Sequence, residues 1–148
     1  PVGPSKDFIV YGDGSSEAED ILARVAAERS MVLAPDPMPQ AGYFYRSDHV
    51  AFAKKGVPML FGGNGLTLHQ GGKNAGLAAK ALFDAKHYHQ VSDEYDPDDW
   101  RLDGIAQALT LLRDLGVELD WADPWPNWYK GNEFRAARDA ALAESATD

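Results

Sequence analysis

The chain has 148 residues, with 14 Lys and Arg against 23 Asp and Glu, so its formal net charge is −9. This balance argues against nucleic acid and anionic membrane surfaces as partners, because both are bound mainly through Lys and Arg. The absence of cysteine excludes disulfides, cysteine-ligated zinc and a thiol nucleophile. No apolar run approaches the roughly 20 residues that a membrane-spanning helix needs.

The first quarter of the sequence alternates strand and helix patterns. The apolar run 8–11 ends in a glycine-rich turn and predicts a buried strand. Ser16 and Glu19 have capping-box spacing, and apolar residues at helical spacing then predict a helix over 16–29. A second short strand is predicted over 31–34. Strand, helix and strand in this order predict an α/β fold.

The middle of the sequence is rich in glycine and aromatic residues. A short helix is predicted over 48–55, with Ser47 or Asp48 as its cap. The apolar run 57–61 predicts a third strand, and the glycines at 62–65 predict a loop after it. These glycines lack the spacing of phosphate-binding loops, so no nucleotide site is expected.

Helical periodicity dominates the remaining sequence. Helices are predicted over 75–85, 103–119 and 132–144, the second being the strongest. An acidic loop over 92–99 lacks the spacing of a calcium-binding EF-hand loop. A connector rich in Trp and Pro covers 121–128, and the four tryptophans of the chain are expected to pack in the core and at its rim. With no internal repeat or linker, one α/β unit is expected.

Histidines next to carboxylates are the first candidates for chemistry. Ser47, Asp48 and His49 are adjacent, and because neighbouring side chains point in different directions they cannot form a triad by themselves. A helix cap is the simpler interpretation.

A second candidate lies farther along the chain, where His87 and His89 alternate and Asp93 follows. On an extended segment both imidazoles would address one metal, with the carboxylate fixing a tautomer. A surface loop with incidental histidines is the alternative interpretation.

Ordered segments of the chain resemble one enzyme family. Residues 42–49 (GYFYRSDH) and 52–58 (FAKKGVP), then 88–96 (YHQVSDEYD), are similar to the co-catalytic zinc aminopeptidases of metallopeptidase family twenty-eight. Residues 125–128 and 132–135 resemble the C-terminus of a bacterial branch. The resemblance implies a zinc-exopeptidase-like three-layer α/β/α fold with a central mixed sheet, and a peptide as substrate.

The resemblance also implies roles for individual residues. His89 corresponds to the last protein ligand of a site for two zinc ions, and Tyr88 to the residue that stabilises the oxyanion of the tetrahedral intermediate. The family motif requires nothing at His87, which disfavours the two-histidine site. The residues expected to line the cleft or to support the ligands are Asp48, His49, Asp93, Tyr43 and Tyr45.

The sequence departs from the family in its other catalytic residues. It contains neither the His-x-Asp motif nor the Glu-Glu pair that supplies ligands and the general base. A catalytic zinc usually needs three protein ligands. We therefore expect a C-terminal portion of an aminopeptidase, inactive alone. Its start, Pro1-Val2-Gly3-Pro4, is neither a signal peptide nor a start methionine, which is expected to reflect truncation. A periplasmic or extracellular location is expected from the resemblance.

Two alternatives remain open at this point. One is a non-enzymatic binding domain that self-associates into a homo-oligomer through an unpaired sheet edge and an exposed apolar face. The other is a relative of the glutaminyl cyclases, which use a similar fold with one zinc ion.

Overall fold

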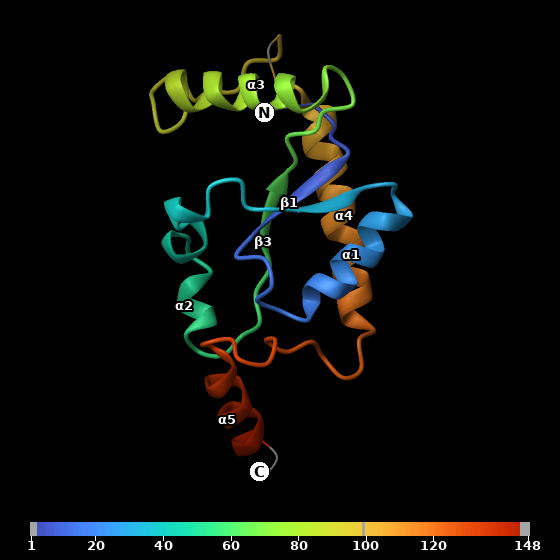
Figure 1. Cartoon of the computed structure of the whole chain (residues 1–148), viewed down its shortest axis with the longest axis vertical. Helices are drawn as coiled ribbons and strands as arrows, with labels where there is room; N and C mark the ends of the chain where they lie inside the picture. The colour runs from blue at the N-terminus through green and yellow to red at the C-terminus, as the bar shows by residue number, and fades with distance from the viewer. Residues whose placement is uncertain (1–2, 99, 146–148) are drawn as a thin grey trace.

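The chain is built around a three-stranded mixed sheet with the strand order β2-β1-β3 (Figure 1). The computed structural model describes residues 3–98 and 100–145, so Pro1, Val2 and Asp99 of the segments considered above lie outside it. Strand β1 (Asp7–Tyr11) pairs in parallel with β2 (Val32–Pro35) and antiparallel with β3 (Phe61–Asn64). The α/β class and the mixed sheet are confirmed.

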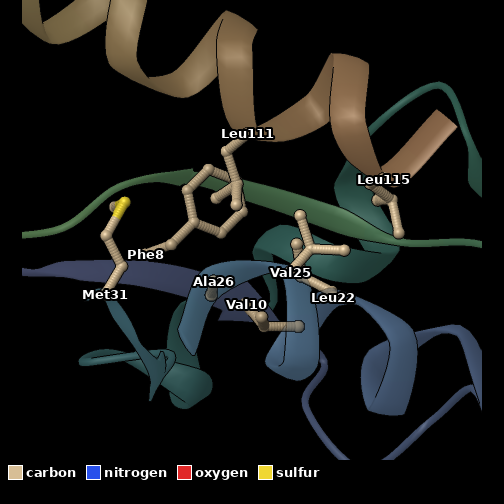
Figure 2. Close-up of a cluster of buried hydrophobic side chains, with 8 residues drawn as sticks. All are labelled: Phe8, Val10, Leu22, Val25, Ala26, Met31, Leu111 and Leu115. Carbon is tan, nitrogen blue, oxygen red and sulfur yellow. The ribbon is translucent and has the colours of Figure 1, made fainter. Parts of the chain in front are cut away.

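Two helices cover one face of the sheet. Because side chains alternate along a strand, Phe8 and Val10 of β1 point to this face. Helices α1 (Ala18–Glu28) and α4 (Leu102–Asp120) pack against it and against each other, close to the predicted ranges. Together these elements form the main core (Figure 2). Its buried residues are Phe8, Val10, Leu22, Val25, Ala26, Met31, Leu111 and Leu115.

The start of α1 shows half of the predicted capping box: Glu19 reaches back to the N–H of Ser16, but the residue at the N-cap position is Glu17, which forms no side-chain cap bond. The carboxylate of Glu19 accepts hydrogen bonds from the backbone N–H groups of Gly14, Ser15 and Ser16 at 2.8, 2.8 and 3.0 Å. The hydroxyl oxygen of Ser16 accepts from the N–H of Ala18 at 3.3 Å. These bonds fix the glycine-rich turn between β1 and α1, because they satisfy N–H groups that have no partner in the helix.

The third strand lies later in the chain than predicted. The run 57–61 was expected as the strand and the glycines after it as a loop, but β3 is formed mainly by those glycines. The reason is close packing: a Cβ atom on Gly62 would meet the ring of Phe8 and lie 2.7 Å from the carbonyl oxygen of Ile9. A strand that passes this near to β1 needs a residue without a side chain.

The remaining helices are η1 (Pro39–Ala41), η2 (Tyr43–Arg46), α2 (Val50–Ala53), α3 (Gly72–Lys86) and α5 (Arg135–Ser145). Helix α3 crosses one end of the molecule, and α5 lies at the opposite end (Figure 1). Helix α2 is shorter than predicted, and the expected cap by Ser47 or Asp48 is wrong. No side-chain cap bond is formed there, and the Ser47 hydroxyl donates instead to the carbonyl oxygen of Tyr43 at 2.9 Å.

A second, smaller core joins the C-terminal segment to the rest. Trp128 is fully buried, packs with Phe134 at 5.2 Å between ring centroids, and donates from Nε1 to the carbonyl oxygen of Gly56 at 3.1 Å. The core position expected for the tryptophans thus holds for Trp128. Trp121 and Trp125 are 81% and 51% exposed and lie outside this core.

Backbone hydrogen bonds also tie this segment to the start of α1. The N–H of Glu17 donates to the carbonyl oxygen of Asn127 at 2.8 Å, and the N–H of Asn127 donates to a Glu17 carboxylate oxygen at 2.9 Å. The segment before α5 is therefore held against the entrance to α1.

Candidate functional site

The second face of the sheet carries a cavity of about 600 Å³. Ile9 and Tyr11, the β1 residues that point away from the main core, contribute to its walls. The other lining residues are Tyr43, Phe61, Asn64, Leu66, Lys80, Phe83, Asp84, Tyr88 and Ile105. A mainly apolar cavity of this size with a few polar groups is typical of a small-molecule site.

Aromatic contacts hold one wall of the cavity. Tyr11 meets Tyr43 edge to face with 5.8 Å between ring centroids, and it packs on Phe61 at 4.9 Å. Burial raises the pKa of Tyr11, and the positive charge of Lys80 opposes this shift. The Tyr11 hydroxyl is therefore protonated at neutral pH and can donate a hydrogen bond.

The charged groups of the cavity form a pair on one face of α3. Lys80 and Asp84 are four residues apart, and the Lys80 ammonium donates to the Asp84 carboxylate at 2.5 Å. Burial tends to lower the pKa of Lys80, but the hydrogen bond and charge of Asp84 outweigh it, so the pKa is raised. Lys80 is thus positively charged at neutral pH.

Tyr88 and His89 lie just beyond the end of α3. Tyr88 lines the cavity. The His89 ring is exposed and stacks on the Tyr88 ring with 3.9 Å between centroids and 20° between planes. The His89 backbone has a φ of 58°, a left-handed conformation that residues other than glycine adopt infrequently. The His89 ring thus packs on Tyr88, but His89 is not among the residues that line the cavity.

The segment around these residues turns, which corrects the extended conformation assumed for the two-histidine interpretation. The Nδ1 atom of His87 lies 2.9 Å from the carbonyl oxygen of Ser92, and the Ser92 hydroxyl donates to the carbonyl oxygen of Lys86 at 2.7 Å. The alternation that would aim two imidazoles at one metal is not formed.

Asp93 lines a different, smaller cavity of about 330 Å³ together with His87, Tyr95 and Trp100. Its backbone N–H donates to the carbonyl oxygen of Gln90 at 3.0 Å. Within the described ranges no hydrogen bond joins the Asp93 carboxylate to His89.

His49 lies outside the cavity, between aromatic rings. Its ring is 4.6 Å from that of Phe44 and 4.8 Å from that of Phe61, and its buried Nε2 atom has no hydrogen-bond partner within the described part of the chain. Burial lowers the pKa of His49, and the nearby charge of Asp48 opposes this shift. Asp48 itself is exposed. His49 therefore supports the packing behind Phe61, and no packing role follows for Asp48.

Of the two tyrosines expected in a cleft, the structure places only one there. Tyr43 lines the cavity. Tyr45 is 60% exposed, and its hydroxyl donates to the carboxylate of Glu133 at 2.7 Å, so it links η2 to the C-terminal segment instead.

Among the polar residues that line the cavity, Tyr11, Asn64, Lys80 and Asp84 were not predicted from the sequence. A signal for two of them was present, because Lys80 and Asp84 stand at i and i+4 within a predicted helix, the spacing of a helical ion pair. For Tyr11, the alternation along β1 indicated the face opposite to Phe8.

The donor set of the described residues does not fit a zinc centre. Residues 3–98 and 100–145 contain no group of three or more His, Asp or Glu side chains placed to hold a metal ion. His89 contributes one ring, whereas a catalytic zinc takes three protein ligands. Among the same residues, no helix is both long and apolar enough to cross a membrane.

The sequence and structure were compared with known protein families, curated proteins and solved structures. Neither a curated protein nor a solved structure gave a match. A family model described as Peptidase family M28 matches residues 1–112, which include all three strands, the cavity and the Tyr88–His89 segment. A match over this share of the chain establishes the relationship: the chain belongs to peptidase family M28.

Proposed function

We propose that this chain acts as the C-terminal portion of a zinc-dependent aminopeptidase, which removes N-terminal residues from peptides, and that it contributes one wall of the substrate cleft. The observation that carries the proposal is the position of Tyr88. It lines an apolar cavity with Tyr43, and both residues lie within the range matched by the peptidase family.

Tyr88 and the apolar lining would have separate tasks in this reaction. The Tyr88 hydroxyl would donate a hydrogen bond to the negative charge that develops on the oxygen of the scissile carbonyl. The side chain of the first substrate residue would pack against Ile9 and Phe61, which removes apolar surface from water. Tyr43 would hold this wall in place through its contact with Tyr11.

His89 is proposed as one metal ligand, a role that requires partners beyond those gathered by the described residues. When bound, zinc supplies a Lewis acid and an activated water in such enzymes. Because the donor set is incomplete here, we assign no zinc-dependent step to this chain by itself.

The first test measures the chain alone. Purified protein with zinc should not hydrolyse leucine p-nitroanilide above the rate of zinc in buffer. Robust hydrolysis that is removed by a chelator and by His89→Ala would show a complete site and refute the proposal.

The second test supplies the missing donors. Co-expression with the N-terminal segment of a family M28 aminopeptidase, chosen to carry its His-x-Asp and Glu-Glu motifs, should restore hydrolysis if the two parts bind. His89→Ala should abolish the restored activity, and Tyr88→Phe should lower kcat by about 10²-fold or more through the lost oxyanion donor. His87→Ala is the matched control and should keep most of the activity. The assignment would be contradicted by a complex that forms but stays inactive. It would also be contradicted by restored hydrolysis that His89→Ala leaves unchanged.

A second candidate function is non-enzymatic binding or self-association. The favouring observation is the exposure of apolar side chains on α3 and α4, including Leu77, Leu82 and Leu109. In α3 only Gly76 is buried. Sedimentation velocity measures this directly: a concentration-dependent dimer that Leu82→Lys disrupts would support it, and a monomer at all concentrations would exclude self-association.

A further inference from the structure

Of the described residues that line the cavity on the second sheet face, two are charged, and they have opposite signs. Lys80 and Asp84 lie 2.5 Å apart on one face of α3, while the other lining residues are uncharged. We propose that this cavity binds a free α-amino acid with an apolar side chain, held as a zwitterion by Lys80 and Asp84.

The charge arrangement favours this ligand class over a simple anion or cation. An anion would be attracted by Lys80 but repelled by Asp84. A cation would be attracted by Asp84 but repelled by Lys80. An α-amino acid carries its ammonium and carboxylate on one carbon, about 3 Å apart. This separation matches that of the Lys80 and Asp84 charges, so each group of the ligand can face its opposite. In a peptide the two termini are farther apart and match less well.

The existing ion pair does not block such a ligand. The side chains of Lys80 and Asp84 are 29% and 42% exposed to solvent, and ion pairs in contact with water contribute little to stability. The ligand's charges can therefore join the pair at small cost. Hydroxyl groups of Tyr11 and Tyr43 and the amide of Asn64 supply further hydrogen-bonding groups in the same cavity.

The rest of the cavity accounts for an apolar side chain. Ile9, Phe61, Leu66, Phe83 and Ile105 contribute aliphatic and aromatic surface. A volume of about 600 Å³ accommodates a leucine or phenylalanine with room for water. Burial of that side chain supplies affinity, and the charge pair supplies orientation.

The same cavity carries Tyr88, which gives binding a consequence for catalysis. An apolar amino acid is the class of product that an aminopeptidase releases. This regulatory interpretation rests on the proposed function, in which a bound product beside Tyr88 would compete with substrate. Binding itself rests only on the cavity and its charge pair.

The proposal is tested by titrating the isotope-labelled full chain with L-leucine and following backbone amide signals by NMR, without zinc or peptide. Signals of Tyr43, Lys80, Asp84 and Tyr88 should shift in a saturable manner. L-Leucinamide lacks the carboxylate and N-acetyl-L-leucine lacks the ammonium, so each should bind about tenfold more weakly or worse, as expected when a charged partner is lost.

Variants assign each charge. Lys80→Met should weaken binding of L-leucine about tenfold but should not weaken binding of L-leucinamide, which has no carboxylate to lose. Asp84→Asn should weaken the binding of L-leucine by a similar factor and leave the binding of N-acetyl-L-leucine unchanged, because that ligand has no ammonium group. Lys73→Met, a change of an exposed residue in the first turn of α3 outside the cavity, is the control and should bind as the original chain does.

Three results would overturn the inference: no shift at millimolar L-leucine, equal affinity for the three ligands, or shifts confined to residues outside the cavity. Leucine and leucinamide are compared on the unmodified chain, so misfolding of a variant does not obscure the outcome. Binding in this pattern by a chain that never supports hydrolysis would uphold the inference and count against the proposed function. Restored hydrolysis without leucine binding would do the opposite.

Discussion

Replacement of Trp128 by Phe should lower the free energy of unfolding by about 2–4 kcal/mol. The indole is fully buried, and its Nε1 atom donates to the carbonyl oxygen of Gly56 at 3.1 Å. Phe cannot donate, and a buried carbonyl without its partner costs about 1–3 kcal/mol. The smaller ring also loses contacts with Phe134 and leaves a void, which adds about 1 kcal/mol or more. Because Gly56 follows α2, the loss should loosen the loop that leads to β3.

Urea unfolding followed by circular dichroism measures this effect, with Trp121→Phe as the matched control. Trp121 is 81% exposed, so the control should change stability by no more than about 0.5 kcal/mol. The reasoning would be refuted if the two variants were equally stable, or if the loss at Trp128 stayed below about 1 kcal/mol.

Three further predictions concern stability. Burial lowers the pKa of His49 from its ordinary 6.5, so the folded chain favours the neutral ring and loses stability as the pH falls through that value. The difference in urea midpoint between about pH 7.5 and about pH 5 should therefore be smaller in His49→Phe than in the original chain, and an equal difference would contradict this. Glu19→Ala removes the acceptor of three backbone N–H groups and should cost about 1–2 kcal/mol in thermal unfolding, a neutral result excluding its capping role. Gly76→Ala should lower Tm, because the added Cβ would clash with the backbone of Leu66, whereas Gly116→Ala in α4 meets nothing and should stabilise by about 0.5–1 kcal/mol. A similar shift for both glycine variants would show that α3 is not anchored through Gly76.

The sequence predicted the elements whose stability is encoded locally. The capping residues and apolar spacing of α1, and the long periodic pattern of α4, located both helices within about two residues. Strand β3 was misplaced because its position depends on a neighbour far away in the sequence. Gly62 is needed where the ring of Phe8 crosses the strand, and a local pattern cannot reveal that contact.

The candidate site was predictable in part for the same reason. Tyr43 and Tyr88 could be named from a resemblance to family motifs, and the structure places both on one cavity. Lys80 and Asp84 belong to no such motif, and their spacing is equally that of a surface ion pair. Only the folded structure shows that both residues line the cavity beside Ile9 and Tyr11 of β1.

The hydrogen bonds between Glu17 and Asn127 have a consequence for the order of folding. They close a loop of 110 residues, for which chain entropy alone costs about 4 kcal/mol. During synthesis the sheet and α1 emerge well before residue 127, so the entrance to α1 must wait for the tail. The hydrogen bonds between Glu17 and Asn127 are therefore expected to form last in folding and to break first in unfolding. A protease would attack the chain there before it reached the sheet.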